Sequence, residues 1–137
     1  MLGLDTNVIA RLVLADDAVQ TEQARAAIAQ AQAEDETIVL ALATVLELEW
    51  VLRSRAKLDK TQVLLIFKKL LETQDLQIEN EQALEQAIYV YENGPADFPE
   101  CLFWSQYQRM GCRAMLTFDA KAARLGGSTG GACASSY

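Results

Sequence analysis

Four short apolar segments, each long enough for one buried strand, alternate along this chain with longer segments of helical character. They comprise residues 1–5, 37–41, 76–78 and 114–118. Continuous apolar or β-branched runs are typical of strands that are covered on both faces. Strands separated by helices pair in parallel, because a helical crossover returns the chain to the same end of the sheet. The pattern therefore predicts an α/β fold with a central, mainly parallel sheet of about four to five short strands flanked by helices.

The segments between the strands carry helix signals. Ala24, Ala27, Ile28 and Ala31 have the spacing of one buried helix face. Asp59 and Asn80 are suited to cap the helices that follow them, and Asn93-Gly94-Pro95 is a stop signal. Besides the two helices that begin at Asp59 and Asn80, we expect helices over residues 6–14, 17–34, 44–52, 97–110 and 120–125.

The composition excludes several kinds of active site. Histidine is absent from the 137 residues, so no Ser-His-Asp triad, Cys-His pair or His-ligated zinc can form. Cys101, Cys112 and Cys133 lack the C-x-x-C spacing of a zinc knuckle, and their odd number argues against a disulfide framework. We interpret them as reduced, structural thiols. Carboxylates are therefore the groups that we expect to carry out any chemistry in this chain.

The formal net charge of −7 argues against broad binding to nucleic acid, which usually needs a basic face. It is compatible with a nuclease, because divalent cations reverse the charge of an acidic site. No apolar run reaches the roughly 18 residues of a membrane helix, and the N-terminus lacks the features of a signal peptide. We expect a cytoplasmic protein with no membrane partner.

Two aspartates stand in the same local setting. Asp5 and Asp119 each follow directly after an apolar strand segment. Ligands of α/β sheets bind just beyond the carboxyl ends of the strands, so two such strands in one sheet bring these carboxylates together. The alternative is that each aspartate caps the helix that follows it.

The remaining candidate acids lie on predicted helices. Glu47 stands in an almost wholly apolar helix, where an unpaired buried carboxylate costs several kcal/mol, roughly, unless a cation compensates it. Its spacing from Thr44 also fits a capping box, and Glu49 is expected on the surface. Asp97 and Glu100 share one helix face, and they too fit a capping box.

Taken together, these acids form an oxygen-only donor set in a chain without histidine. Such sets suit hard divalent ions, Mg²⁺ or Mn²⁺. Two such ions activate a water molecule and stabilise the leaving oxygen in phosphodiester hydrolysis. The candidate metal ligands and catalytic residues are Asp5, Glu47, Asp119 and either Glu100 or Asp97.

Four segments, in order, resemble the motifs of PIN-domain nucleases, especially the VapC-type toxins of bacterial toxin–antitoxin systems. They are Met1–Val8, Leu46–Arg53, Gly94–Leu102 and Leu116–Leu125. The resemblance implies a PIN domain over residues 1–125 that acts as a metal-dependent endoribonuclease. It also implies an RNA substrate, a homodimer, and a cognate antitoxin that inserts basic residues into the acidic site.

The resemblance assigns roles to single residues. Asp5, Glu47 and Asp119 match the acidic ligands of the family directly. In the third segment Glu100 stands where the family usually has aspartate, and bulky residues follow it, so whether Glu100 or Asp97 is the third ligand stays open. The side chains expected to support the ligands are Thr6, Asn7 and Thr117. The basic residues near the motifs, which are candidates to meet phosphate, are Arg11, Arg53, Lys121 and Arg124.

The sequence also leaves two other functions open. The altered third segment also fits a non-catalytic PIN-like module that binds RNA or a protein. An aspartate nucleophile for phosphotransfer is a weaker option, because Asp5 lacks the second aspartate two residues on that such sites usually have. Residues 126–137 are rich in Gly and Ser, so we expect a flexible tail without the short final strand that similar proteins often have.

Overall fold

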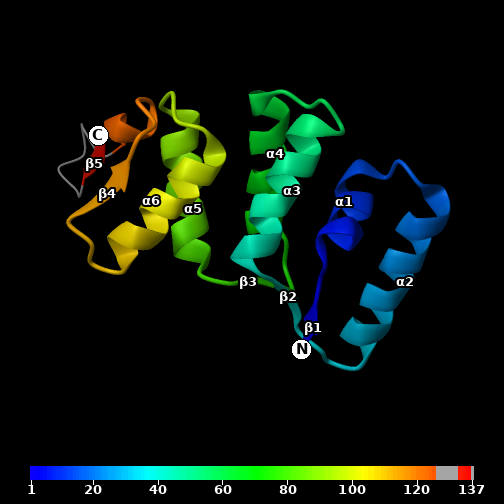
Figure 1. Cartoon of the computed structure of the whole chain (residues 1–137). Helices are drawn as coiled ribbons and strands as arrows, with labels where there is room; N and C mark the ends of the chain where they lie inside the picture. The colour runs from blue at the N-terminus through cyan, green and yellow to red at the C-terminus, as the bar shows by residue number, and fades with distance from the viewer. Residues whose placement is uncertain (126–132, 137) are drawn as a thin grey trace. The chain divides into compact units, whose positions relative to one another are not determined.

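The structure, a computed structural model, describes residues 1–125 and the backbone of residues 133–136. Five strands, six α-helices and one 3-10 helix alternate along these residues (Figure 1). Every pair of strands is parallel, and the predicted α/β fold is confirmed. The strands belong to two sheets, and the chain divides into two compact units, Met1–Glu79 and Asn80–Tyr137.

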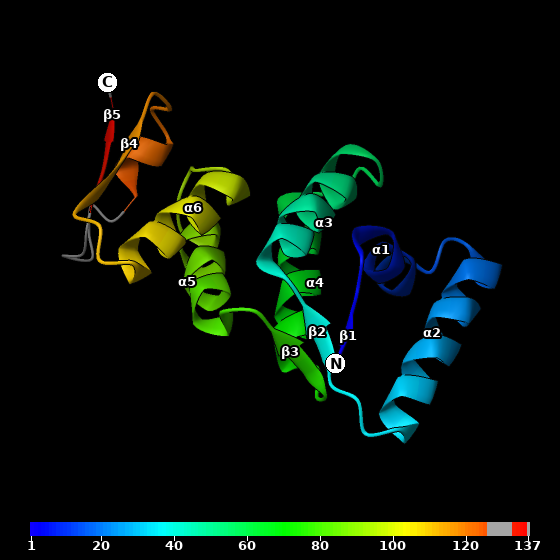
Figure 2. The same ribbon diagram turned by 60° about the horizontal axis from the view of Figure 1, so that its bottom comes forward.

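The sheet of the N-terminal unit has the strand order β1-β2-β3. Figure 2 shows these short strands side by side, with β1 at the edge. Leu2 is paired with Ile38, and Ile38 with Leu76, so the three strands are in register. The strand bounds are Leu2–Gly3 for β1, Ile38–Leu40 for β2 and Leu76–Ile78 for β3.

Four helices pack around this sheet, and capping side chains define where three of them begin. Asp5 and Asp17 are the N-caps of α1 and α2, and Asp59 forms a full capping box with Gln62 at the start of α4. These starts agree with the prediction. None of the helices in the described part of the chain has both the length and the apolar character that crossing a membrane requires. The helix bounds are Thr6–Leu14 for α1, Ala18–Ala33 for α2, Leu42–Ser54 for α3 and Lys60–Glu72 for α4.

Helix α3 begins earlier than the sequence predicts. Its N-cap is Ala41, which offers no capping side chain, and Thr44 already lies in the first turn. The backbone N–H of Leu42 instead donates to Oε1 of Glu79 at 3.0 Å. The predicted capping box between Thr44 and Glu47 is therefore wrong, because a carboxylate distant in sequence satisfies a helix-terminal donor.

The two glutamates of α3 have exchanged their expected environments. Glu49, expected on the surface, is only 1% exposed, and its Oε2 accepts a hydrogen bond from Nε of Arg53 at 2.9 Å. Glu47, expected in a buried setting, is exposed. Residues two apart on a helix point to nearly opposite sides. An almost uniformly apolar helix does not reveal which side is buried, and both predictions are wrong for this reason.

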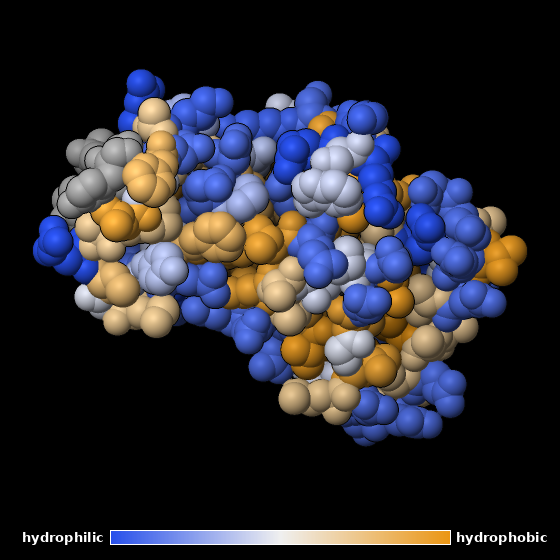
Figure 3. Space-filling model, in the orientation of Figure 1, coloured by the Kyte–Doolittle hydropathy of each residue, from blue (hydrophilic) through white to orange (hydrophobic). Residues whose placement is uncertain are grey.

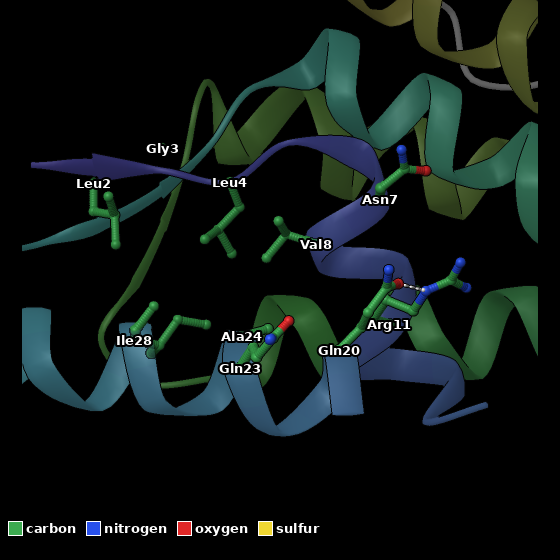
Figure 4. A pocket seen from close by; sticks show the side chains of 11 residues that line it. Leu2, Gly3, Leu4, Asn7, Val8, Arg11, Gln20, Gln23, Ala24 and Ile28 are labelled. Atoms are coloured by element: carbon green, nitrogen blue, oxygen red, sulfur yellow. Dashed lines mark hydrogen bonds between the residues drawn. The ribbon is translucent and has the colours of Figure 1, made fainter. Parts of the chain in front are cut away.

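The predicted buried face of α2 borders an open groove. Ala31 is buried, but Ala24 and Ile28 are only half-buried and Ala27 is exposed. A cavity of about 440 Å³ separates this face from β1 and α1. Figure 4 shows apolar side chains of both walls pointing into it, and Figure 3 shows apolar residues at the surface in this region. The wall opposite α2 includes Leu2, Leu4 and Val8.

The C-terminal unit pairs two helices with a small sheet. Asn80 caps α5 by accepting from the backbone N–H of Ala83 at 3.3 Å. Helices α5 and α6 pack closely, with the rings of Tyr91 and Phe98 edge to face at 5.6 Å. The bounds are Glu81–Glu92 for α5, Phe98–Arg109 for α6, Ala114–Thr117 for β4, Ala122–Arg124 for the 3-10 helix η1 and Cys133–Ser136 for β5.

The final strand was not expected from the sequence. β4 and β5 pair in parallel over four residues each. The expectation that no strand follows the last acidic segment is therefore wrong for residues 133–136, because pairing with a neighbouring strand overrides the weak β-propensity of alanine. Residues 126–132 and Tyr137 of the predicted flexible tail lie outside the described residues. The domain boundary after residue 125 stays a prediction.

Ser105 links α6 to α5 and provides a test of this packing. Its buried Oγ donates to the carbonyl oxygen of Ala83 at 2.8 Å and lies 2.9 Å from Oε1 of Gln86. We expect Ser105→Ala to lower the free energy of unfolding by about 1 kcal/mol, the usual contribution of a buried hydrogen bond. Urea denaturation followed by circular dichroism measures this change.

Ser54, half-buried at the end of α3, provides the matched control. We expect Ser54→Ala to change the free energy of unfolding by about 0.5 kcal/mol or less. Equal losses in the two variants would contradict a specific stabilising role for the Ser105 hydrogen bonds.

Candidate functional site

Asp5 lies in the turn between β1 and α1. Its exposed carboxylate accepts a hydrogen bond from the backbone N–H of Thr6 at 2.7 Å, through Oδ1. The capping role considered from the sequence is therefore confirmed. A carboxylate has about four acceptor positions in total, and this bond occupies one of them. Capping the helix and holding a cation are thus compatible roles for Asp5.

A hydrogen bond between side chains joins the start of α1 to α3. Thr6 is a buried residue with an exposed fraction of 7%. Its hydroxyl donates to Oε2 of Glu47 at 3.0 Å. Thr6 and Glu47 are 41 positions apart in the sequence, so this contact depends on the tertiary fold. It fixes the Glu47 carboxylate beside the turn that carries Asp5.

These residues line one polar pocket of about 450 Å³ in the N-terminal unit. One wall is the β1–α1 turn, and the other is one side of α3. The lining offers two carboxylates, a hydroxyl and an amide, together with an indole and one guanidinium group. The lining residues are Asp5, Thr6, Asn7, Glu47, Trp50, Val51 and Arg55.

The third acidic segment lies at the start of α6. Asp97 occupies the N-cap position and is exposed, but its side chain makes no capping hydrogen bond. The capping box with Glu100 is therefore not formed, and that interpretation of the spacing is wrong. Glu100 is half-buried in the first helical turn, and Pro99 takes the second helical position. A proline is tolerated there because the first-turn N–H groups have no partner within the helix.

Asp119 follows β4, as the sequence predicts. Its Oδ1 accepts from the backbone N–H of Ala122, the first residue of the short helix η1, at 2.8 Å. Its own backbone N–H donates to Oγ1 of Thr117 at 3.0 Å. Thr117 thereby contacts the backbone that carries Asp119, and the role expected for it in supporting the ligands stays a prediction. The exposed Asp119 carboxylate, like that of Asp5, keeps unused acceptor positions.

The predicted site residues fall into two sets. Asp5, Thr6, Asn7 and Glu47 meet in the pocket of the N-terminal unit. Neither unit gathers three or more His, Cys, Asp or Glu side chains into one group among its described residues. The complete set of four acidic ligands stays a prediction. The second set of predicted site residues lies in the C-terminal unit and comprises Asp97, Glu100, Thr117 and Asp119.

Two of the basic residues expected to meet phosphate form ion pairs with neighbouring carboxylates. Arg11 pairs with Asp16 at 3.2 Å, and Arg53 pairs with the buried Glu49. The pocket instead contains Arg55, with its guanidinium carbon 5.5 Å from the ring centroid of Trp50. Neither Trp50 nor Arg55 was predicted from the sequence as a site residue.

A helical spacing in the sequence reveals them. Glu47, Val51 and Arg55 are successively four residues apart, and Trp50 follows Glu47 by three. Residues at these intervals share one face of a helix. The pattern was obscured because the predicted helix ended at residue 52.

The comparison with protein families decides the classification. A family model described as "PIN domain" matches residues 3–128, which is nearly the whole chain. The chain belongs to the PIN-domain family. No significant match was found among curated proteins or among solved structures. PIN domains are typically nucleases and generally use divalent metal ions, so membership supports a nuclease-type activity.

The donor chemistry of this PIN domain fits a hard divalent ion. The carboxylates of Asp5 and Glu47 line one pocket with the hydroxyl and amide of Thr6 and Asn7. Mg²⁺ is commonly held by one or two carboxylates while it keeps several water molecules. The pocket therefore has suitable ligands for part of a metal site.

Two N-cap aspartates differ in whether their side chains cap the helix that follows. Asp59 caps α4 through a capping box, whereas Asp97 makes no cap hydrogen bond. We expect Asp59→Ala to lower the free energy of unfolding by about 1 kcal/mol, and Asp97→Ala by about 0.5 kcal/mol or less. Thermal or urea unfolding measures both. A larger loss for Asp97→Ala would show that Asp97 stabilises the fold after all.

Proposed function

We propose that this PIN domain is a metal-dependent endoribonuclease, the toxin of a VapBC-like toxin–antitoxin system. The observation that carries the proposal is the polar pocket of the N-terminal unit. There Asp5 and Glu47, from separate parts of the sequence, line one space and Thr6 donates to Glu47. A pair of carboxylates held in this way fits the divalent ions that PIN domains generally use.

Each residue has a role in this proposal. Asp5 and Glu47 would hold Mg²⁺ or Mn²⁺, and the further ligands proposed are Asp119 and either Glu100 or Asp97. The chemistry supplied by such an ion would be activation of water and stabilisation of the charge that develops during hydrolysis of the RNA phosphodiester bond. Thr6 keeps the Glu47 carboxylate in one orientation, and preorganised ligands of this kind lower the cost of reaching the reactive geometry.

The biological setting is proposed from the resemblance to VapC-type toxins. It includes a homodimer, a cytoplasmic location and a cognate antitoxin. The net charge of −7 supports an antitoxin that inserts basic residues, because complementary charge speeds association and selects the partner. The neighbouring reading frame tests this part: it should encode a small DNA-binding protein with a basic C-terminal segment.

The central prediction concerns Asp5. We expect Asp5→Asn to lower RNA cleavage in the presence of Mg²⁺ or Mn²⁺ by at least about a hundredfold, since loss of metal binding removes several kcal/mol of transition-state stabilisation. Asparagine caps helices as well as aspartate does, so the fold should survive. A labelled RNA resolved on a denaturing gel measures cleavage, and thermal unfolding checks the fold.

Asp16→Asn is the matched control, because Asp16 is an exposed aspartate that pairs with Arg11 and does not line the pocket. We expect its cleavage rate to remain within about threefold of the wild type. Undiminished cleavage by Asp5→Asn would overturn the assignment of the site.

A second candidate function is a non-catalytic PIN-like module that binds RNA or a protein partner. The observation that favours it is that, within each unit, the described residues form no group of three potential metal ligands. Calorimetric titration with Mn²⁺ separates the two functions. Heat of binding that is absent from Asp5→Asn supports the nuclease, whereas a silent titration of the wild type supports the binding module.

A further inference from the structure

Trp50 is an exposed aromatic residue on the side of α3 that lines the polar pocket. It is 49% exposed, whereas the other tryptophan, Trp104, is only 2% exposed and belongs to the core. Single exposed aromatic residues are common on protein surfaces, so the significance of Trp50 lies in its place in the lining of the polar pocket. Trp50 follows Glu47 by three residues, so the indole and the candidate metal ligand share one helix face.

Arg55 gives this aromatic surface a positive charge. Its guanidinium carbon lies 5.5 Å from the centroid of the Trp50 ring, within cation–π distance. It is the only cationic side chain in the pocket lining, and it forms no ion pair among the described residues, although two carboxylates line the same pocket. Its charge is therefore available to an anionic ligand.

We propose that Trp50 and Arg55 form a subsite for one nucleotide of single-stranded RNA. The base stacks on the indole–guanidinium pair, and Arg55 binds a neighbouring phosphate. This inference rests on the proposed ribonuclease function and adds to it the form of the substrate. A nucleotide offers both an aromatic face and an anion, which are the two features that Trp50 and Arg55 recognise.

Stacking on Trp50 requires an unpaired nucleotide, and the size of the pocket suits a small ligand. The base must leave its stack before its face can meet the indole, which excludes a base inside a duplex. The pocket volume of about 450 Å³ lies within the range of about 300 to 1,000 Å³ that is usual for small-ligand sites. Since every base has a stacking face, the subsite selects for a single strand more than for a particular base.

The charges that line the pocket also explain why phosphate binding there needs a positively charged side chain such as Arg55. Asp5 and Glu47 repel phosphate in the absence of metal, and Arg55 offsets part of this repulsion within the same pocket. A nucleotide held by Trp50 and Arg55 lies beside the carboxylate of Glu47. The subsite therefore places the RNA backbone next to the proposed metal ligands.

The test measures RNA binding separately from cleavage. Binding of a short fluorescein-labelled single-stranded RNA to the full chain is followed by anisotropy in EDTA, and again with Ca²⁺. We expect Trp50→Ala to raise Kd by about tenfold, the usual effect of losing one base–aromatic stack. Trp50→Phe keeps an aromatic face, so its Kd should stay within about threefold of the wild type.

Arg55 is tested through the salt dependence of binding. We expect Arg55→Ala to raise Kd by about fivefold and to reduce the slope of log K against log salt by about 0.7, the change for one lost phosphate contact on a single strand. Arg25→Ala on α2 and Tyr89→Ala on α5 are the controls, because both side chains are exposed and neither lines the pocket. Both controls should bind like the wild type.

The possible results separate the subsite from the proposed function. If Trp50→Ala unfolds at the wild-type temperature and binds RNA equally well, the subsite is overturned, even if the wild type cleaves RNA with Mn²⁺. If the wild type fails to bind RNA in both EDTA and Ca²⁺, the subsite is also overturned. If Trp50→Ala weakens binding while the wild type shows no cleavage, the subsite stands and the nuclease function fails. Equal affinity for the matching duplex would contradict the single-strand preference.

Discussion

The hydrogen bond from Thr6 to Glu47 is the contact on which the pocket depends. It connects the turn after β1 to the exposed side of α3 over a distance of 3.0 Å. The buried position of Thr6 restricts its rotamers, and a restricted donor orients the acceptor that it binds. Because Asp5 immediately precedes Thr6 and caps α1, the same turn positions both carboxylates. The relative placement of the two acids is thus set by backbone geometry and one side-chain bond.

The carboxylates of this chain show that capping and ligand roles do not exclude each other. Asp5 and Asp119 each use one oxygen to accept a backbone N–H, which leaves further acceptor positions on each group. Asp97 stands at a helix N-cap without a capping bond. Local spacing therefore shows where an acid lies at the end of an element, but it does not show what the acid does there.

Helix α3 has one buried side and one side that lines the polar pocket. Glu49 points to the buried side, where Arg53 binds one of its oxygens and the other, Oε1, has no hydrogen-bond partner among the described residues. Leaving a buried carboxylate oxygen unpaired costs stability. On the opposite side, Glu47, Trp50 and Arg55 face the pocket. A nearly apolar helix conceals this division in the sequence, because its periodicity does not distinguish the two sides.

Local signals in the sequence determined the alternation of strands and helices and the starts of the helices at Asp17, Asp59 and Asn80. Four ordered segments were enough to suggest the PIN-domain family. Only the tertiary structure decided the early start of α3, its buried side, the pairing of β5 and the hydrogen bond between Thr6 and Glu47. The reason is physical: caps and strand propensity act within a few residues. The carboxylate of Glu79 that meets α3, the partner strand of β5 and the hydroxyl of Thr6 that binds Glu47 all come from distant parts of the chain.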